Sequence, residues 1–363
     1  MNEKASREDR VEKLSSVQYL RACAALLVLV THSFSYQVGD HAPFVGLTGH
    51  LGVMLFFVIS GFIMVYISGE APFSALTFLK RRAIRIVPLY WLFTIFAALL
   101  AALLPNLFQR TIFTWPHFLE SLLFIVHEAP KTGSLSPLLS LGWTLNYEVY
   151  FYIAFAMVAF LHVGPRVILL SILFIGAWLV GLLAPPTNPV LQFYLHPAPL
   201  AFAAGTWIGW LFLNGEVTSN KRRILALGLV AAGGLALAFA DGGTLGFAGQ
   251  IVWATCLLVL GLLLESKLGQ WNLFEKLGDA SYTLYLSHIF VVGAVVHLAK
   301  RTIGADTAMA VILTATISIV VSCTAALVIH KTVEKPMLRI LSGKRKPRQT
   351  TFAAVATGVG ERS

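Results

Sequence analysis

Charged residues are scarce in this sequence. They make up 12% of 363 residues, whereas hydrophobic residues make up 57% and the mean hydropathy is +0.77. A soluble domain carries about a quarter charged residues, so this chain has too few to cover a surface that faces water. The charges lie in short clusters between long apolar runs, a pattern typical of repeated bilayer spans. The composition therefore excludes a soluble globular protein and predicts an all-α polytopic membrane protein.

Cysteines are also few. Cys23, Cys256 and Cys323 all lie inside apolar runs, and their spacing excludes both a disulfide framework and a zinc motif, so we expect small buried side chains. A cleavable signal peptide is not expected, because the first apolar run follows a charged head and keeps polar residues at its far end. The net charge of +10 comes from basic residues that lie between apolar runs. This distribution indicates membrane topology and not a nucleic-acid partner.

Ten apolar runs are long enough to cross a hydrocarbon core of about 30 Å. They cover 17–36, 47–68, 84–104, 143–162, 166–184, 195–213, 223–240, 244–264, 280–299 and 308–330. With the N-terminus inside, 22 of the 27 Lys and Arg residues lie on the cytoplasmic side and four outside. This bias predicts that both termini are cytoplasmic, in a multi-pass protein of a bacterial inner membrane.

Three segments follow from this layout. Residues 1–16 form a cytoplasmic head, 17–336 a membrane domain, and 337–363 a basic cytoplasmic tail that we expect to be unstructured and close to anionic lipid. The outer connection 105–142 contains Pro116, which predicts a short helix running through Val126. Its apolar residues indicate a helix lying on the membrane interface or dipping into it.

Ionisable residues inside a span are costly and usually functional. Arg21 and His32 are eleven residues apart in the first span, so they point the same way and are separated by about 16 Å along the helix axis. Glu148 lies about 7 Å below the outer surface if its span begins near Trp143. That depth matches His32, which predicts a polar site in the outer half of the bundle.

Two further groups stand out. Ser281, Tyr285 and His288 form one helical stripe in the ninth predicted span. Arg82 and Arg85 lie one turn apart near the cytoplasmic end of the third span, and guanidinium groups suit phosphate well.

Simpler interpretations stay open for most of these residues. Arg82 and Arg85 also fit a positive-inside anchor, and Arg21 also fits a side chain that extends to the cytoplasmic face. His32 also fits a solvated span end, and the stripe in the ninth span also fits hydrogen bonding between helices. Glu148 is harder to dismiss, because a lone carboxylate at that depth costs several kcal/mol.

Six motifs occur in order along the chain. They are Gln18-Tyr19-Leu20-Arg21 with His32, Gly52-Val53 to Phe56-Phe57-Val58-Ile59-Ser60-Gly61-Phe62, Arg82-Ala83-Ile84-Arg85, Gly142-Trp143-Thr144-Leu145-Asn146-Tyr147-Glu148, Gly278-Asp279-Ala280-Ser281-Tyr282 to His288, and Val333-Glu334-Lys335-Pro336. In these motifs the sequence resembles the acyltransferase 3 family of bacterial membrane O-acyltransferases, within it the branch of exopolysaccharide acetyltransferases.

The resemblance implies a ten-helix core and an acyl-CoA donor used from the cytoplasm. It also implies that His32 and Arg21 are catalytic and that Arg82 and Arg85 lie near the donor. One position departs from the family, because many relatives carry an acidic residue where this chain has Met54. No role of that carboxylate carries over.

These observations give one working hypothesis. The enzyme transfers an acyl group, acetyl being the expected one, from cytoplasmic acyl-CoA to a sugar hydroxyl of a cell-surface polysaccharide or exopolysaccharide, with the acceptor free or lipid-linked. His32 acts as general base, Glu148 orients its ring, and Arg21 holds the donor or stabilises developing charge. Direct transfer is the simpler route, and a covalent acyl-histidine intermediate is the alternative that stays open. No bound cofactor and no metal are expected.

The expected partners besides the two substrates are membrane lipids. The candidates for lining a cavity between donor and acceptor are Ser281, Tyr282, Tyr285 and His288. A secondary transporter, or a flippase component of polysaccharide export, is the alternative that the sequence leaves open.

Overall fold

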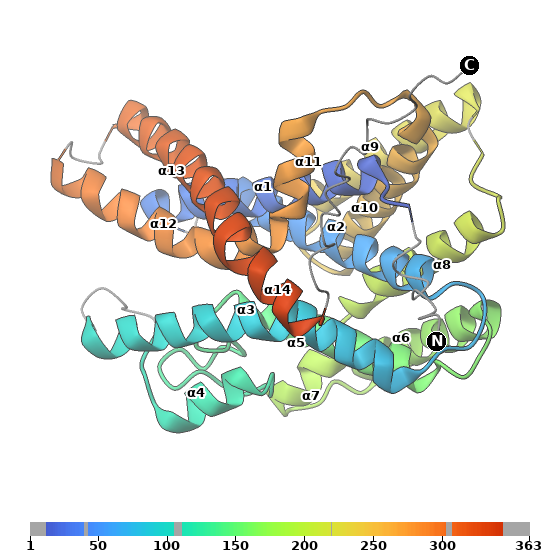
Figure 1. Ribbon diagram of the computed structural model, residues 1–363, viewed down its shortest axis with the longest axis horizontal. Helices are drawn as coiled ribbons and strands as arrows, with labels where there is room; N and C mark the ends of the chain where they lie inside the picture. Colours follow the sequence, from blue (N-terminus) through green and yellow to red (C-terminus); the bar gives the residue numbers. More distant parts are fainter. Residues whose placement is uncertain (1–11, 40–42, 105–110, 219, 303–306, 344–363) are drawn as a thin grey trace, which may run out of the picture.

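A computed structural model describes residues 12–39, 43–104, 111–218, 220–302 and 307–343. Within these ranges the chain is helical and contains no strand (Figure 1). Most of the predicted head 1–16, and the predicted tail beyond residue 343, lie outside the described residues.

The helices follow one another along the chain with short connections. They are α1 (Ser15–Val38), α2 (Pro43–Ser68), α3 (Ala75–Leu103), α4 (Trp115–Leu122), α5 (Gly142–Met157), α6 (Val163–Leu183), α7 (Pro189–Tyr194), α8 (Pro199–Leu213), α9 (Lys221–Ala240), α10 (Thr244–Leu264), α11 (Asn272–Asp279), α12 (Ser281–Thr302), α13 (Ala308–Ile329) and α14 (Lys335–Leu341). In Figure 1, α3 runs along the lower half with α4 beneath it and α14 crossing it, while α1, α12 and α13 lie above.

Among the described residues, eight helices are long and apolar enough to cross a membrane. They correspond to eight of the ten predicted spans, and the prediction of an all-α polytopic membrane protein is confirmed. The other two are shorter than predicted, since α5 has 16 residues and α8 has 15. Helix α8 begins at Pro199 because proline fits the first turn of a helix and disrupts its interior.

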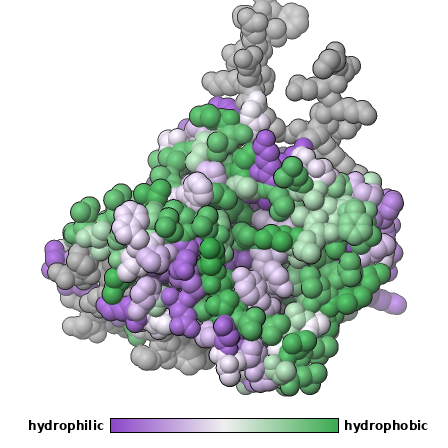
Figure 2. Space-filling model, turned by 90° about the horizontal axis from the view of Figure 1, so that it is seen from below, coloured by the Kyte–Doolittle hydropathy of each residue, from purple (hydrophilic) through white to green (hydrophobic). Residues whose placement is uncertain are grey.

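The outer surface of the bundle is apolar. Large hydrophobic side chains such as Leu183, Leu225 and Met309 are well exposed, and hydrophobic residues form broad areas of the face seen in Figure 2. Such a surface is unfavourable in water and favourable against lipid chains. Exposure of this kind is therefore a consequence of the membrane environment.

Small residues bring α1 and α2 close together. Gly49 of α2 lies against Thr31 of α1, and a Cβ added at Gly52 would stand 2.6 Å from the carbonyl oxygen of Ala24. Close backbone approach at glycine is how membrane helices gain packing contacts. The order of these contacts shows that the two helices run antiparallel.

Arg166 is one of the 22 Lys and Arg residues that the sequence assigned to the cytoplasmic side. In the structure its side chain is fully buried. Its guanidinium donates to the carbonyl oxygens of Ala71 at 3.0 Å and Leu161 at 2.7 Å, and lies 4.7 Å from the ring centroid of Phe73. A buried charge needs such partners. Arg166 therefore joins the α2–α3 connection to the start of α6.

The outer connection contains the predicted short helix. Helix α4 has Pro116 in its first turn, as expected, but it ends at Leu122 and not at Val126. The chain turns there because Phe124 adopts a left-handed conformation with φ of 58°. The Tyr90 hydroxyl donates to the Ser121 carbonyl at 3.0 Å, which ties the end of α4 to α3.

Helix α13 continues into α14 through a π-helical turn at His330–Glu334. Pro336 follows in the first turn of α14 and has no N–H to donate to the preceding turn. Turns of this kind are frequent at functional sites. Here the turn carries two of the side chains described below.

Candidate functional site

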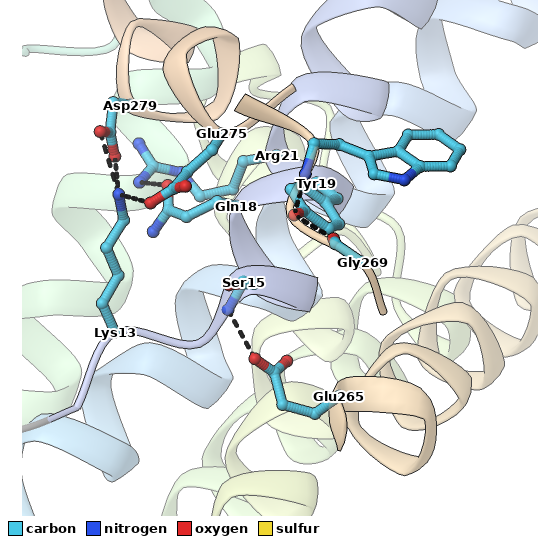
Figure 3. A network of polar contacts seen from close by, with 10 residues as sticks. Lys13, Ser15, Gln18, Tyr19, Arg21, Glu265, Gly269, Glu275 and Asp279 are labelled. Atoms are coloured by element: carbon cyan, nitrogen blue, oxygen red, sulfur yellow. Dashed lines mark hydrogen bonds and ion pairs between the residues drawn. The ribbon is translucent and has the colours of Figure 1, made fainter. Parts of the chain in front are cut away.

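The N-terminus of α1 is capped by a residue from another part of the chain. Leu14 stands at the capping position and offers no side-chain oxygen. Instead, the carboxylate of Glu265 accepts from the backbone N–H of Ser15 at 2.7 Å (Figure 3). It also accepts from the backbone N–H of Ser16 at 2.9 Å. A carboxylate at a helix N-terminus satisfies free N–H groups and complements the helix dipole. This contact fixes α1 against the end of α10.

Helix α11 holds the same end of α1 from the other side. The Lys13 ammonium contacts Glu275 at 2.8 Å and Asp279 at 3.0 Å (Figure 3). The Tyr19 hydroxyl accepts from the backbone N–H of Trp271 at 2.9 Å. Partial burial lowers the pKa of Lys13, but its hydrogen bonds to the Glu275 and Asp279 carboxylates outweigh this and raise the pKa above its usual value. These contacts fix the N-terminal end of α1.

Arg21 lies inside this clamped end. Its guanidinium donates to the side-chain oxygen of Gln18 at 3.3 Å (Figure 3). It also interacts electrostatically with Arg85, Glu148 and Glu334, which come from three other elements. The structure therefore places Arg21 in an internal charged cluster, which favours the functional interpretation over a side chain that extends to the membrane surface.

The predicted arginine pair contributes to this cluster. Arg85 forms an ion pair with Glu334, and its guanidinium lies 5.6 Å from the ring centroid of Tyr282. The Tyr282 hydroxyl donates to the carbonyl of Ile86 at 2.7 Å, which fixes the ring against α3. Arg82 lies 6.0 Å from the ring centroid of Phe78. Both guanidinium groups of the pair therefore lie near aromatic rings, in the N-terminal half of α3.

Glu334 was quoted in a motif, but sequence reasoning gave it no role. Its side chain is fully buried, and both carboxylate oxygens are occupied. One oxygen accepts from Arg85, and the other accepts from the Thr283 hydroxyl and lies 2.6 Å from Nδ1 of His330. A glutamate four residues after a histidine, at the C-terminal end of the last span, was the signal that could have identified it.

Glu148 also belongs to the arginine cluster. Its carboxylate accepts from Ser60 at 3.3 Å and from the hydroxyl of Tyr152, one turn along α5. It interacts electrostatically with Arg82 and Arg85. The charged groups that act on the Glu148 carboxylate are therefore the two arginines of α3.

The prediction that Glu148 shares the depth of His32 is wrong. Gly49 lies against Thr31, beside His32, and Ser60 is eleven residues further along the antiparallel α2, about 16 Å away. Arg21 is separated from His32 by the same number of residues. The carboxylate, bonded to Ser60, is therefore level with Arg21. The prediction counted the depth of Glu148 along a straight span of full length. Helix α5 has only 16 residues, so that count does not give the position of Glu148 in the bundle.

His32 has a different neighbour. The rings of His32 on α1 and His288 on α12 have centroids 5.1 Å apart. One turn before His288, the Tyr285 hydroxyl lies 2.7 Å from the hydroxyl of Thr144 and donates to the carbonyl of Leu141 at 3.1 Å. The stripe predicted on this helix thus faces α1 and α5.

The candidate residues form two groups. The arginine end contains Arg21, Arg82, Arg85, Glu148, Glu334 and Tyr282. The histidine end contains His32, His288 and Tyr285, and lies about 16 Å further along α1. Ser281 is buried on α12, and its hydroxyl has no hydrogen-bond partner among the described residues.

The chemistry of the two ends differs. Guanidinium groups at the arginine end suit a polyanion such as a phosphate, whereas imidazoles at the histidine end suit proton transfer. Within the part of the chain that the structure describes, no group of three or more His, Cys, Asp or Glu side chains is placed to hold a metal ion.

A bundle of membrane helices with ionisable groups inside it defines a polytopic membrane protein with an internal polar site. Comparison with known proteins identifies its family, because the model of the acyltransferase domain matches residues 14–331. The chain belongs to this family, and it is a membrane acyltransferase.

Two curated relatives support the assignment. The chain is 37% identical to the exopolysaccharide production protein ExoZ of Rhizobium meliloti (strain 1021), over 68% of this chain and 78% of the relative. It is 24% identical to the acyltransferase MdmB of Streptomyces mycarofaciens, over 94% of this chain and 95% of the relative. No solved structure matches significantly.

Proposed function

We propose that this protein is an O-acyltransferase of the bacterial inner membrane, which transfers an acetyl group from cytoplasmic acetyl-CoA to a hydroxyl of an exopolysaccharide sugar. Its family supports the group transfer, and the relative whose name refers to exopolysaccharide production supports the acceptor. The observation that carries the proposal is the pair of polar ends on one helix, with Arg21 at the arginine end and His32 at the histidine end.

The arginine end binds the nucleotide of the donor. Arg82 and Arg85 provide the positive charge for the phosphates, and Arg21 continues that charge toward the interior. The ion pair with Glu334 occupies one nitrogen of Arg85, and a guanidinium has five N–H donors, so this contact leaves donors for a phosphate. An extended pantetheine arm matches the spacing between the two ends and carries the thioester toward His32.

The histidine end carries out the transfer. The sugar oxygen attacks the thioester carbonyl carbon while His32 takes the hydroxyl proton. The carbon–sulfur bond then breaks, and His32 returns the proton to the departing thiolate, which leaves an ester and free CoA. An imidazole suits this work at neutral pH. Arg21 stabilises the charge of the bound donor, and Glu148 balances the arginine charges instead of orienting His32.

The decisive experiment uses the purified protein in lipid vesicles, with radiolabelled acetyl-CoA and exopolysaccharide precursor from a strain that lacks the gene. We expect label in an ester on the sugar, which base releases. NMR of polysaccharide from wild-type and deletion strains should show the same acetyl signal present and absent. Movement of the polysaccharide without acetyl-CoA, and without ester formation, would contradict the proposal and indicate the transporter or flippase alternative.

A further inference from the structure

His288 presents one ring nitrogen as a buried acceptor. Its Nδ1 lies 3.0 Å from the carbonyl oxygen of Leu284, one turn earlier in α12. A carbonyl only accepts hydrogen bonds, so this contact places the proton on Nδ1 and leaves Nε2 with a lone pair. The side chain is 1% exposed, and Nε2 has no hydrogen-bond partner among the described residues. A buried acceptor without a donor is costly, so it marks a place where a donor is expected.

The ring of His32 is at the right distance to supply that donor. A second histidine pair in this protein gives the scale, because the rings of His117 and His127 have centroids 4.8 Å apart and nitrogens 2.6 Å apart. The centroids of His32 and His288 are 0.3 Å further apart, at 5.1 Å against 4.8 Å. The two pairs differ in the angle between their rings, 42° for His32 and His288 against 74° for His117 and His127, so the comparison concerns only how near the rings lie. Ring centroids at 5.1 Å leave no room for another side chain between the two imidazoles.

Two other polar side chains that the sequence connected with His32 are engaged elsewhere. Tyr285 lies 6.1 Å from the His288 ring, but its hydroxyl is engaged with Thr144 and with the carbonyl of Leu141. Glu148, which the sequence placed beside His32, is level with Arg21. The orienting role that the sequence assigned to this carboxylate therefore needs a different residue.

We infer that His288 is the positioning residue for His32. Its Nε2 accepts the N–H of one His32 ring nitrogen and thereby fixes the tautomer, so that the other nitrogen carries the lone pair that meets the sugar hydroxyl. The protonated His32 ring keeps this hydrogen bond until it returns its proton to the CoA thiolate, so no proton is gained or lost by the pair. The inference rests on the proposed function, because it needs His32 to act as the base.

The test uses two amide variants that differ in where the acceptor stands. His288→Gln puts an amide oxygen near the position of Nε2, whereas His288→Asn puts its amide near Nδ1, beside the Leu284 carbonyl. His288→Leu removes both nitrogens. His297→Gln, at an exposed position on the same helix, is the matched control. The kcat for acetyl transfer and the KM for acetyl-CoA are measured in vesicles, with the folded fraction checked by size exclusion.

We expect His288→Asn and His288→Leu to lower kcat about 100-fold, the lower range of what a well-presented general base contributes. Their KM for acetyl-CoA should stay within about twofold of the wild type. The kcat of His288→Gln should be at least about tenfold higher than the kcat of His288→Asn or His288→Leu. Equal rates for the Gln and Asn variants, or a wild-type kcat for His288→Leu, would overturn the inference while leaving the proposed function intact. An inactive wild type would instead contradict the proposed function itself.

Discussion

Arg85 donates to the carboxylate of Glu334, a residue 249 positions later in the chain. This ion pair joins the N-terminal half of α3 to the π-helical turn between α13 and α14. Thr283 and His330 hold the second carboxylate oxygen, so α12 belongs to the same junction. The arginine end is therefore assembled from helices that are far apart in the sequence, and Glu334 holds the guanidinium of Arg85 in place.

Replacing Glu334 with Gln tests this junction. Gln keeps the size of the side chain but removes the charge that Arg85 faces, and breaking a buried pair costs about 3–5 kcal/mol when both partners are buried. Arg85 is 29% exposed, so we expect a smaller loss, and a several-fold weaker affinity for acetyl-CoA. Thermal unfolding and equilibrium binding measure the two effects. Glu70→Gln, at an exposed position, should change neither, and wild-type affinity in Glu334→Gln would contradict the assigned role.

The double variant Arg82→Ala, Arg85→Ala tests the donor site. The loss of two charge-assisted contacts, at roughly 1.5–3 kcal/mol each, should weaken acetyl-CoA binding well over tenfold while the protein still inserts into the membrane. Lys221→Ala with Arg222→Ala removes two exposed charges at the start of α9 and serves as the control. If both double variants bind acetyl-CoA like the wild type, Arg82 and Arg85 only anchor the topology.

Topology is open to a labelling test. Lys131 is exposed in the outer connection, and Lys267 is exposed just after α10. The positive-inside bias predicts that a cysteine at position 131 reacts with a membrane-impermeant maleimide in intact cells, whereas a cysteine at position 267 reacts only after lysis. The wild-type protein, with its three native cysteines, gives the background. Labelling of both positions in intact cells, or of position 267 alone, would contradict the predicted orientation.

The histidine pair of the outer connection predicts a pH effect. Burial, and then the charge of His127, lower the pKa of His117 to about 4. The unfolded side chain titrates near 6.5, so the stability that this group contributes is present above about pH 6.5 and is lost as the pH falls toward 4. Thermal unfolding at pH 7.5 and 5.5 should therefore differ more in the wild type than in His117→Asn. The same difference in both proteins would contradict this origin.

The sequence predicted the fold well because hydropathy and charge bias decide which segments lie in lipid. It also brought Arg21, Arg82 and Arg85 into one hypothesis. It misplaced Glu148, because depth was counted along a single straight span and contacts between helices were invisible. It gave Glu334 no role for the same reason, since no periodicity reports a partner 249 residues away.

Acyl transfer by His32→Ala tests the central claim most directly. If His32 is the general base, this variant should fall below about 1% of the wild-type rate, within the range that general-base catalysis contributes. Its membrane abundance and its affinity for acetyl-CoA should stay unchanged, because Arg82 and Arg85 hold the donor about 16 Å away. The matched control His297→Ala should keep the wild-type rate. An acyl-transfer rate for His32→Ala close to that of the wild type would contradict the mechanism proposed for this protein.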